Sequence, residues 1–186
     1  MKEVNNILRI LEETKIAIET KDYSRIKNLS NQTINTASLT QDPDNIAVAV
    51  VVYSLSKIFE REHYKQYSEY EKIHKIIIYS LECSIEDLEK KDLKDFRKDF
   101  ENIRACIKKI SGKLKEYIQE VFRKARINKA SRIYEHGISM EQTAKLLGIT
   151  MFELADYVGK TGISDVPENK TLDTKSRIKL AEEIFG

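Results

Sequence analysis

The sequence predicts an all-α fold that combines an N-terminal bundle of about five helices with a small C-terminal helical domain. The 186 residues include only six Gly and two Pro, and 33% of them are charged, a composition that favours helices over a turn-rich sheet. Apolar residues recur at steps of three and four along most of the chain, which is the helical period. We expect residues 1–125 to form the bundle and residues 126–186 the second domain.

Two amphipathic helices are predicted to open the bundle. The first covers Lys2–Thr20, ends at Lys21–Asp22, and has an apolar face made of Val4, Ile7, Leu8, Leu11 and Ile18. The second, Tyr23–Ser38, has one apolar face and many amides and hydroxyls, namely Asn28, Asn31, Gln32, Thr33, Asn35 and Thr36. These polar side chains either face solvent or form a polar network inside the bundle, and the pattern leaves both possibilities open.

The apolar segment Ile46–Tyr53 has a sequence that, by β-propensity alone, would form a strand. The preceding Asp42–Pro43–Asp44 is a strong helix start, because the first aspartate can cap, proline suits the first turn, and the second aspartate complements the helix dipole. We therefore predict one helix from Pro43 to about Glu62 as the central helix of the bundle. An amphipathic helix over about Tyr64–Glu82 should follow it.

A long fifth helix is predicted next, opened by Ser84 and Asp87, which have the spacing of a capping box. Its apolar residues form a heptad row: Leu93, Phe96, Phe100, Ile103, Ile107, Ile110, Leu114, Tyr117 and Val121. Such a row packs inside a bundle or pairs two chains in a homodimer, and both readings stay open. Gly112 lies within the helix and can bend it into two halves.

Composition limits which cellular compartment and which binding partners we expect. The formal net charge is only +2, so no overall field attracts nucleic acid. Cys83 and Cys106 lack the spacing of a zinc site and are expected to be buried thiols, and no metal or cofactor motif is present. The first residues do not form a signal peptide, and the longest apolar run is too short for a bilayer, so we expect a cytoplasmic protein without a membrane partner. The chain has no evident internal repeat, and its abundant Lys, Glu and Ile are typical of heat-adapted or archaeal proteins.

The most informative stretch is Ser139–Val158, whose pattern predicts two short helices joined by a tight turn. Ala144 is small where a second helix must cross, and Gly148 can take the left-handed conformation that ends the first helix. Three apolar residues occupy inward-facing positions: Ile149, Leu154 and Tyr157. In these residues the stretch resembles the helix-turn-helix of prokaryotic DNA-binding regulators and of antitoxins. The resemblance implies that the second helix, Met151–Lys160, enters the major groove.

A basic cluster borders this motif. Between Arg104 and Arg132 there are ten Lys or Arg residues and only two Glu, an excess that also fits ordinary helix polarity. The predicted groove helix itself carries Glu153 and Asp156 on its outer face, and these carboxylates repel phosphates. We expect neighbouring cations to supply the phosphate contacts: Arg123, Lys124, Arg126, Lys129, Arg132, Lys145 and Lys160.

Two functional hypotheses follow. The first is a non-enzymatic nucleic-acid-associated regulator, either a transcription regulator or an antitoxin-like protein, with DNA favoured over RNA and the bundle used for dimerisation or for a protein partner. In the antitoxin form the loop or arm Gly159–Asn169 would engage a toxin, while a last helix, Thr174–Phe185, closes the small domain. The alternative is a protein–protein adaptor that binds no nucleic acid.

A third hypothesis concerns the N-terminal half. Ala17–Tyr23 and the helices after it resemble the small helical domains called HEPN, many of which are ribonucleases. That resemblance implies a catalytic Arg and His four to six residues apart on one helix face. Arg61 and His63 are only two residues apart here, and His74 is too distant. We therefore expect no enzymatic activity, and at most a degenerate ribonuclease-related domain.

Overall fold

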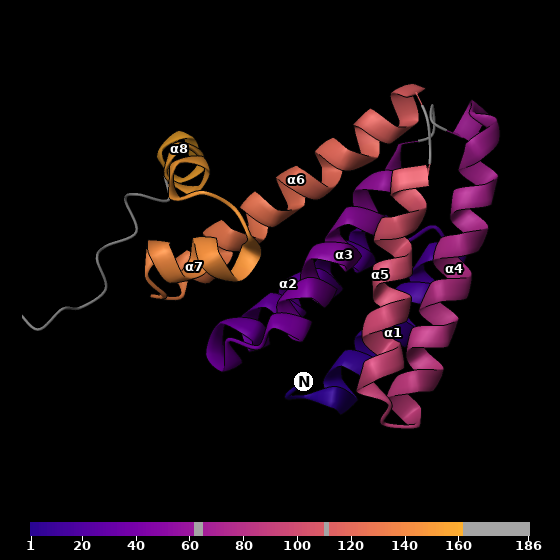
Figure 1. The fold of residues 1–186 in the computed structure, drawn as a ribbon, viewed down its shortest axis with the longest axis horizontal. Helices are drawn as coiled ribbons and strands as arrows, with labels where there is room; N and C mark the ends of the chain where they lie inside the picture. The colour runs from indigo at the N-terminus through magenta and orange to yellow at the C-terminus, as the bar shows by residue number, and fades with distance from the viewer. Residues whose placement is uncertain (62–64, 110–111, 162–186) are drawn as a thin grey trace, which may run out of the picture.

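The computed structural model describes residues 1–61, 65–109 and 112–161, which form eight helices and no strand (Figure 1). The helices are α1 (Val4–Glu19), α2 (Tyr23–Thr40), α3 (Pro43–Glu60), α4 (Ser68–Glu89), α5 (Leu93–Lys109), α6 (Gly112–Glu135), α7 (Met140–Leu147) and α8 (Met151–Thr161). The all-α fold class is confirmed for these residues. The predicted helix Thr174–Phe185 and most of the predicted arm before it lie outside the described residues.

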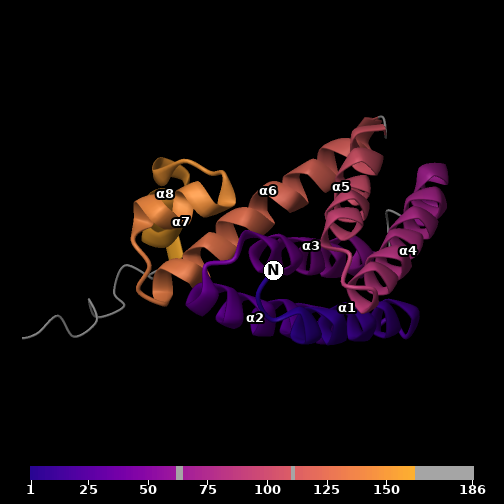
Figure 2. The same ribbon diagram turned by 60° about the horizontal axis from the view of Figure 1, so that its bottom comes forward.

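Antiparallel pairs of helices build the larger lobe of the molecule (Figures 1 and 2). α1 packs against α2, α2 against α3, and α4 against α5, while α1 also contacts α4. The core of this lobe draws on α1 to α5 and the first half of α6, with Ile10, Val51, Phe59, Leu81 and Phe96 among its buried side chains. α6 then crosses α3 and leads to a smaller lobe, which consists of α7 and α8.

α3 is a helix despite its β-branched sequence, because its start is capped and its sides are covered. The Asp42 carboxylate accepts hydrogen bonds from the backbone N–H groups of Asp44 at 2.9 Å and of Asn45 at 3.4 Å. Val48–Val52 are all buried, since α2 and α6 both pack on this helix. Tertiary packing of an almost wholly apolar helix thus outweighs the local strand propensity.

The junction between α4 and α5 differs from the prediction. α4 continues to Glu89, and the Ser84 hydroxyl donates to the carbonyl oxygen of Ser80 at 2.7 Å, so Ser84 does not cap a new helix. The break comes instead at Lys91, whose φ is 60°. Asp92 caps α5 by accepting from the backbone N–H groups two and three residues later.

The heptad row is divided between two helices. α5 ends at Lys109 and α6 begins at Gly112, so the expected bend is a boundary between helices that diverge from this junction (Figure 1). Several members of the row are buried in the core of the chain itself: Phe96, Phe100, Ile103, Leu114 and Val121. These contacts favour packing within one chain over pairing of two chains.

The α1–α2 pair and the α4–α5 pair share one turn, which appears seventy residues later in the second pair. Lys21 and Lys91 are both left-handed, with φ of 58° and 60°. In both turns the next aspartate donates its N–H to a carbonyl five residues back at 2.8 Å and then caps the following helix. The buried hydroxyls of Thr14 and Ser84 also match, each bonded to the carbonyl four residues earlier. The two helix pairs therefore share their turn geometry at a spacing of seventy residues, a similarity that we did not find in the sequence.

A second apolar cluster joins the smaller lobe to the larger one. It contains Ile34, Ala37, Ile46, Ala49 and Val50 of α2 and α3, Ala125, Ala130 and Ile133 of α6, and Ile138, Leu147, Leu154 and Val158. α7 and α8 thus bury their apolar faces against α6 and against one end of the α2–α3 pair.

Two of the predictions made with the cellular compartment, the lack of a membrane-spanning helix and the burial of the cysteines, can be compared with the structure. In the parts of the chain that the structure describes, no helix has the length and hydropathy to cross a bilayer. Cys83 is a half-buried free thiol. The side chain of Cys106 lies outside those described.

Candidate nucleic-acid interface

The turn between α7 and α8 consists of Gly148–Thr150. Gly148 has a φ of 61°, the left-handed conformation expected of it. The Ile149 N–H donates to the Ala144 carbonyl at 3.1 Å and closes the end of α7. Ala144 is only 3% exposed, since α7 packs against α3, α6 and α8. The conformation predicted for Gly148 and the burial predicted for Ala144 are both confirmed.

The apolar positions of the motif face inward to different degrees. Leu154 is fully buried, and Ile149 packs half-buried against the second cluster. Tyr157 is half-buried, and its hydroxyl accepts a hydrogen bond from the side-chain amide of Asn128 at 3.1 Å. Tyr157 therefore fastens α8 to α6 through a polar contact as well as by packing.

Glu153 has a structural role that the sequence analysis missed. Its carboxylate accepts from the Thr150 N–H at 2.9 Å and from the Thr150 hydroxyl at 3.0 Å. In return the Glu153 N–H donates to the Thr150 hydroxyl oxygen at 3.1 Å, which completes a capping box. The Thr150 N–H lowers the pKa of Glu153, so the carboxylate stays ionised at the start of α8. The signal was present as Thr-x-x-Glu, which begins two residues after the turn glycine.

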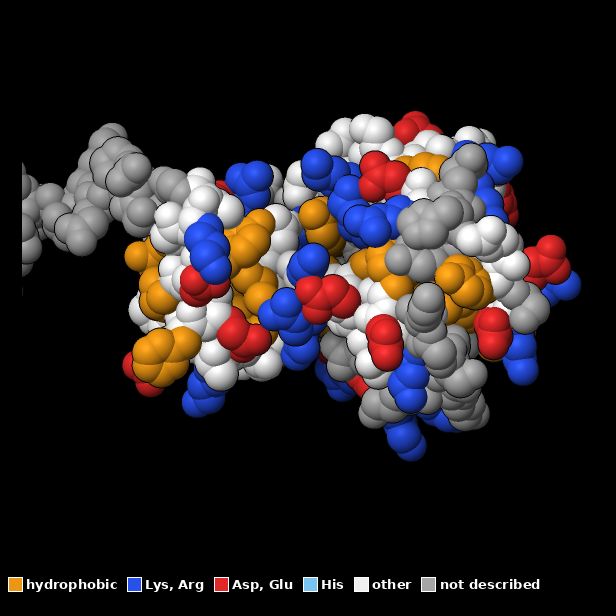
Figure 3. Space-filling view, turned by 90° about the horizontal axis from the view of Figure 1, so that it is seen from above, with side chains coloured by type: hydrophobic (Ala, Val, Ile, Leu, Met, Phe, Trp, Pro, Cys, Tyr) orange, Lys and Arg blue, Asp and Glu red, His pale blue; other side chains and the backbone are white. Residues whose placement is uncertain are grey.

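The outward face of α8 is largely apolar at its start. Met151 is 49% exposed and Phe152 is 87% exposed. Ala155, Asp156 and Gly159 continue the exposed face. Figure 3 shows the smaller lobe at the left, with apolar side chains on its surface bordered by charged ones. Such a face can contact thymine methyl groups or a protein surface.

Three of the predicted cations are exposed and paired with nearby carboxylates. Arg123 makes two hydrogen bonds of 2.9 Å to Glu120 and lies 3.9 Å from Glu153 at the start of α8. Lys124 lies 3.3 Å from the same Glu120, and together these cations lower its pKa to about 2, with Arg123 the larger cause. Lys160 pairs with Asp156 at 2.7 Å. Exposed pairs of this kind are weak, on the order of 0–1 kcal/mol, so a phosphate can replace the carboxylate.

Three other predicted cations, two exposed and one half-buried, are placed differently. Lys145 is exposed on α7 and forms no ion pair with a described residue. Arg132 pairs with Glu135 at 3.0 Å. It lies about two and a half helical turns beyond Arg123, and therefore on the opposite side of α6. Arg126 donates to the Gly148 carbonyl at 3.3 Å and so contacts the turn itself.

Lys129 is a correction to the predicted phosphate contacts, because its side chain is 0% exposed. Its ammonium donates to the Asn31 side-chain oxygen at 2.8 Å and lies 4.3 Å from the centre of the Tyr53 ring. Burial lowers the pKa of Lys129 to about 7. Lys129 thus joins α6 to α2 and α3, and part of the polar face of α2 is an internal contact rather than a solvated one.

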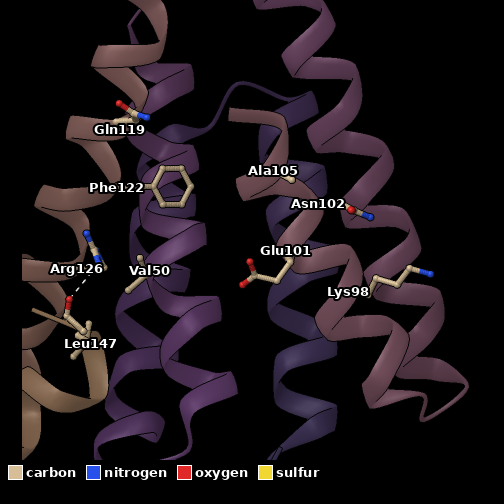
Figure 4. Close-up of a pocket in the computed structure, with 10 residues that line it drawn as sticks. Val50, Lys98, Glu101, Asn102, Ala105, Gln119, Phe122, Arg126 and Leu147 are labelled. Carbon is tan, nitrogen blue, oxygen red and sulfur yellow. Dashed lines mark hydrogen bonds between the residues drawn. The ribbon is translucent and has the colours of Figure 1, made fainter. Parts of the chain in front are cut away.

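A cleft of about 730 Å³ separates α5 from α6 and ends at the turn after α7 (Figure 4). Its floor includes Val50 of α3 and Phe122 of α6, whose ring points into the space. Glu101 of α5 points in from one wall, and Arg126 lies on the opposite wall beside Gly148. This volume is within the range of about 300–1,000 Å³ that is usual for ligand pockets.

Two of the residues weighed for catalysis, Arg61 and His74, each contact an aromatic ring. The Arg61 guanidinium lies 5.2 Å from the centre of the Tyr117 ring. His74 packs its ring on Phe59, and burial lowers the pKa of His74. His63 lies outside the described residues. Among the residues that the structure describes, no three His, Cys, Asp or Glu side chains are grouped so that they could hold a metal ion.

Comparison with known proteins gives no relative for this chain. No protein-family model matches it, and neither a curated protein nor a solved structure matches it significantly.

Proposed function

We propose that this chain is a non-enzymatic nucleic-acid-binding regulator in which α7, the turn and α8 act as a helix-turn-helix on duplex DNA. One observation carries the proposal, namely a left-handed Gly148 that follows the buried Ala144 by four residues. The glycine ends the first helix, and the small alanine lets the second helix cross it closely. In this arrangement α8 presents Met151 and Phe152 to the major groove, where apolar side chains contact thymine methyl groups.

Phosphate contacts come from the exposed cations around α8. We assign this role to Arg123, Lys124, Lys145 and Lys160. The buried Lys129 and the distant Arg132 are left out, and Arg126 is assigned to the turn. In the antitoxin-like form of the proposal the chain after α8 engages a protein partner, and the cytoplasm is the expected compartment of both forms.

A protein–protein adaptor is the second candidate, and the exposure of Phe152 favours it. An aromatic side chain that is 87% exposed at the start of a helix is also the usual anchor of a protein interface. The two candidates differ in whether charge reversal beside α8 changes binding to nucleic acid.

The test measures binding of the full chain to a labelled duplex of about 30 base pairs, roughly three helical turns, by fluorescence anisotropy at low salt. The variant Arg123→Glu, Lys124→Glu, Lys145→Glu should weaken binding by at least about tenfold, because it replaces phosphate contacts with repulsion. Structured RNA is titrated in parallel.

The control variant is Arg25→Glu, Lys90→Glu, Lys94→Glu, which makes the same change of charge at exposed sites near the α1–α2 and α4–α5 turns. It should keep its affinity within about twofold if binding is local to α8. Equal losses in the two variants would contradict a site at α8, and tighter binding to RNA than to DNA would overturn duplex DNA as the target.

A further inference from the structure

We call α1–α3 the first unit and α4–α6 the second, because their first two helices share one turn geometry. The cleft between α5 and α6 arises where these two units differ. In the first unit α3 packs along α2 over most of its length. In the second unit α6 contacts α5 little and instead leaves it to cross α3. The space opened between α5 and α6 is bounded at one end by Leu147 and Gly148, at the turn proposed to position α8.

The walls of the cleft combine four kinds of recognition group. Phe122 offers an aromatic face, because its ring is half-buried between the two apolar clusters and points into the space. Arg126 offers a cation beside the turn. Glu101, on the opposite wall, offers an exposed carboxylate that points inward. Gln119 adds an amide that can donate and accept.

We propose that this cleft binds a purine nucleoside monophosphate, with the base on Phe122, the phosphate on Arg126 and the exocyclic amine of adenine on Glu101. The ligand must carry an anion at one end and a donor at the other, since Arg126 and Glu101 lie on opposite walls. A planar ring between them fits the aromatic side chain.

Binding of the nucleotide in the cleft would affect the turn between α7 and α8 through one hydrogen bond. Arg126 donates to the Gly148 carbonyl at 3.3 Å, and a phosphate is a stronger acceptor than a backbone carbonyl. The nucleotide would draw Arg126 from Gly148 and thereby change the support of the turn before α8. This effect on nucleic-acid binding rests on the proposed function, whereas binding in the cleft does not.

The experiment is calorimetric titration of the full chain with AMP, without any nucleic acid. AMP should bind with a Kd no higher than the low millimolar range. Adenosine and inorganic phosphate should each bind at least about tenfold more weakly, since adenosine lacks the phosphate and phosphate lacks the base. IMP should also bind about tenfold more weakly, because a carbonyl oxygen then faces the Glu101 carboxylate. Phosphate binding as tightly as AMP would overturn the nucleotide site.

Variants test each wall separately. Glu101→Gln, at an exposed position, should narrow the difference between AMP and IMP to within about threefold, since an amide can donate as well as accept. Arg126→Gln and Phe122→Leu should weaken AMP by about tenfold each, while Arg132→Gln, on α6 outside the cleft, should not. In NMR spectra AMP should shift the Ile149 N–H signal, which shares a peptide unit with the Gly148 carbonyl. Absence of AMP binding, or equal affinities in wild type and all cleft variants, would overturn the proposal.

Discussion

The variant Ala144→Glu is expected to lose the native packing of α7 and α8 while the larger lobe stays folded. Ala144 is 3% exposed where α7 contacts three other helices, so the glutamate side chain has neither space nor solvent. Burying an unpaired charge and overpacking the site should cost about 3–5 kcal/mol. NMR spectra of the full chain should show loss of dispersed signals from residues 138–161, with signals from α1 to α5 retained.

Ala144→Ser is the matched control, since it adds one polar atom without a charge, and it should keep the native spectrum. Gly148→Val should be less destabilising than Ala144→Glu, at about 1–2 kcal/mol. A Cβ at Gly148 meets nothing within 4 Å, so the cost comes only from the positive φ. A native spectrum for Ala144→Glu would contradict the close crossing of helices at this position.

The stability of the wild type is expected to rise with pH above neutrality because of Lys129. The pKa of Lys129 in the folded chain is about 7, below the ordinary lysine value of 10.5 that the unfolded chain should have. Between these values the unfolded chain binds more protons than the folded chain, so the free energy of unfolding increases with pH. The gain should be about 2 kcal/mol between about pH 7 and about pH 9. Below about pH 7 the ammonium is charged in both states, and the full cost of burying it remains.

Lys129→Met should remove this pH dependence and raise stability at about pH 6, because a thioether needs no hydration and Asn31, which is half-buried, can turn to water. Lys124→Met, at an exposed site on the same helix, is the control and should leave the slope unchanged. Urea unfolding at a series of pH values measures the effect. Equal slopes for the wild type and Lys129→Met would show that Lys129 is not a buried, titrating group.

Elements with strong local signals could be predicted from the sequence. α3 followed from the Asp42 cap and Pro43, and the α7 end followed from Gly148, because these effects depend on a few neighbouring residues. The predicted position of the α4–α5 junction was wrong. A serine hydroxyl can cap the start of a helix, but inside a helix it can also donate to the carbonyl oxygen four residues earlier, as Ser84 does. Lys91–Asp92 repeats the motif of Lys21–Asp22, and this comparison could have located the break.

Features that depend on how helices cross were not predictable in the same way. Lys129 looked like part of a basic surface, although its position four residues from both Ala125 and Ile133 places it on the apolar side of α6. The partners of Lys129, Asn31 and Tyr53, lie on helices that are far from it in the sequence. The cleft likewise depends on the direction in which α6 leaves α5, and no local pattern specifies that direction.

The salt dependence of binding to duplex DNA tests the central claim most directly. If Arg123, Lys124, Lys145 and Lys160 each neutralise one phosphate, the logarithm of the association constant should fall against the logarithm of salt concentration with a slope of about −3.6. Removing Lys145 alone by Lys145→Gln should reduce the slope by about 0.9 without unfolding the chain, since its side chain is exposed. A measurable slope of this size would support a regulator that meets the phosphate backbone beside α8. No binding at low salt, or a slope near zero, would contradict it.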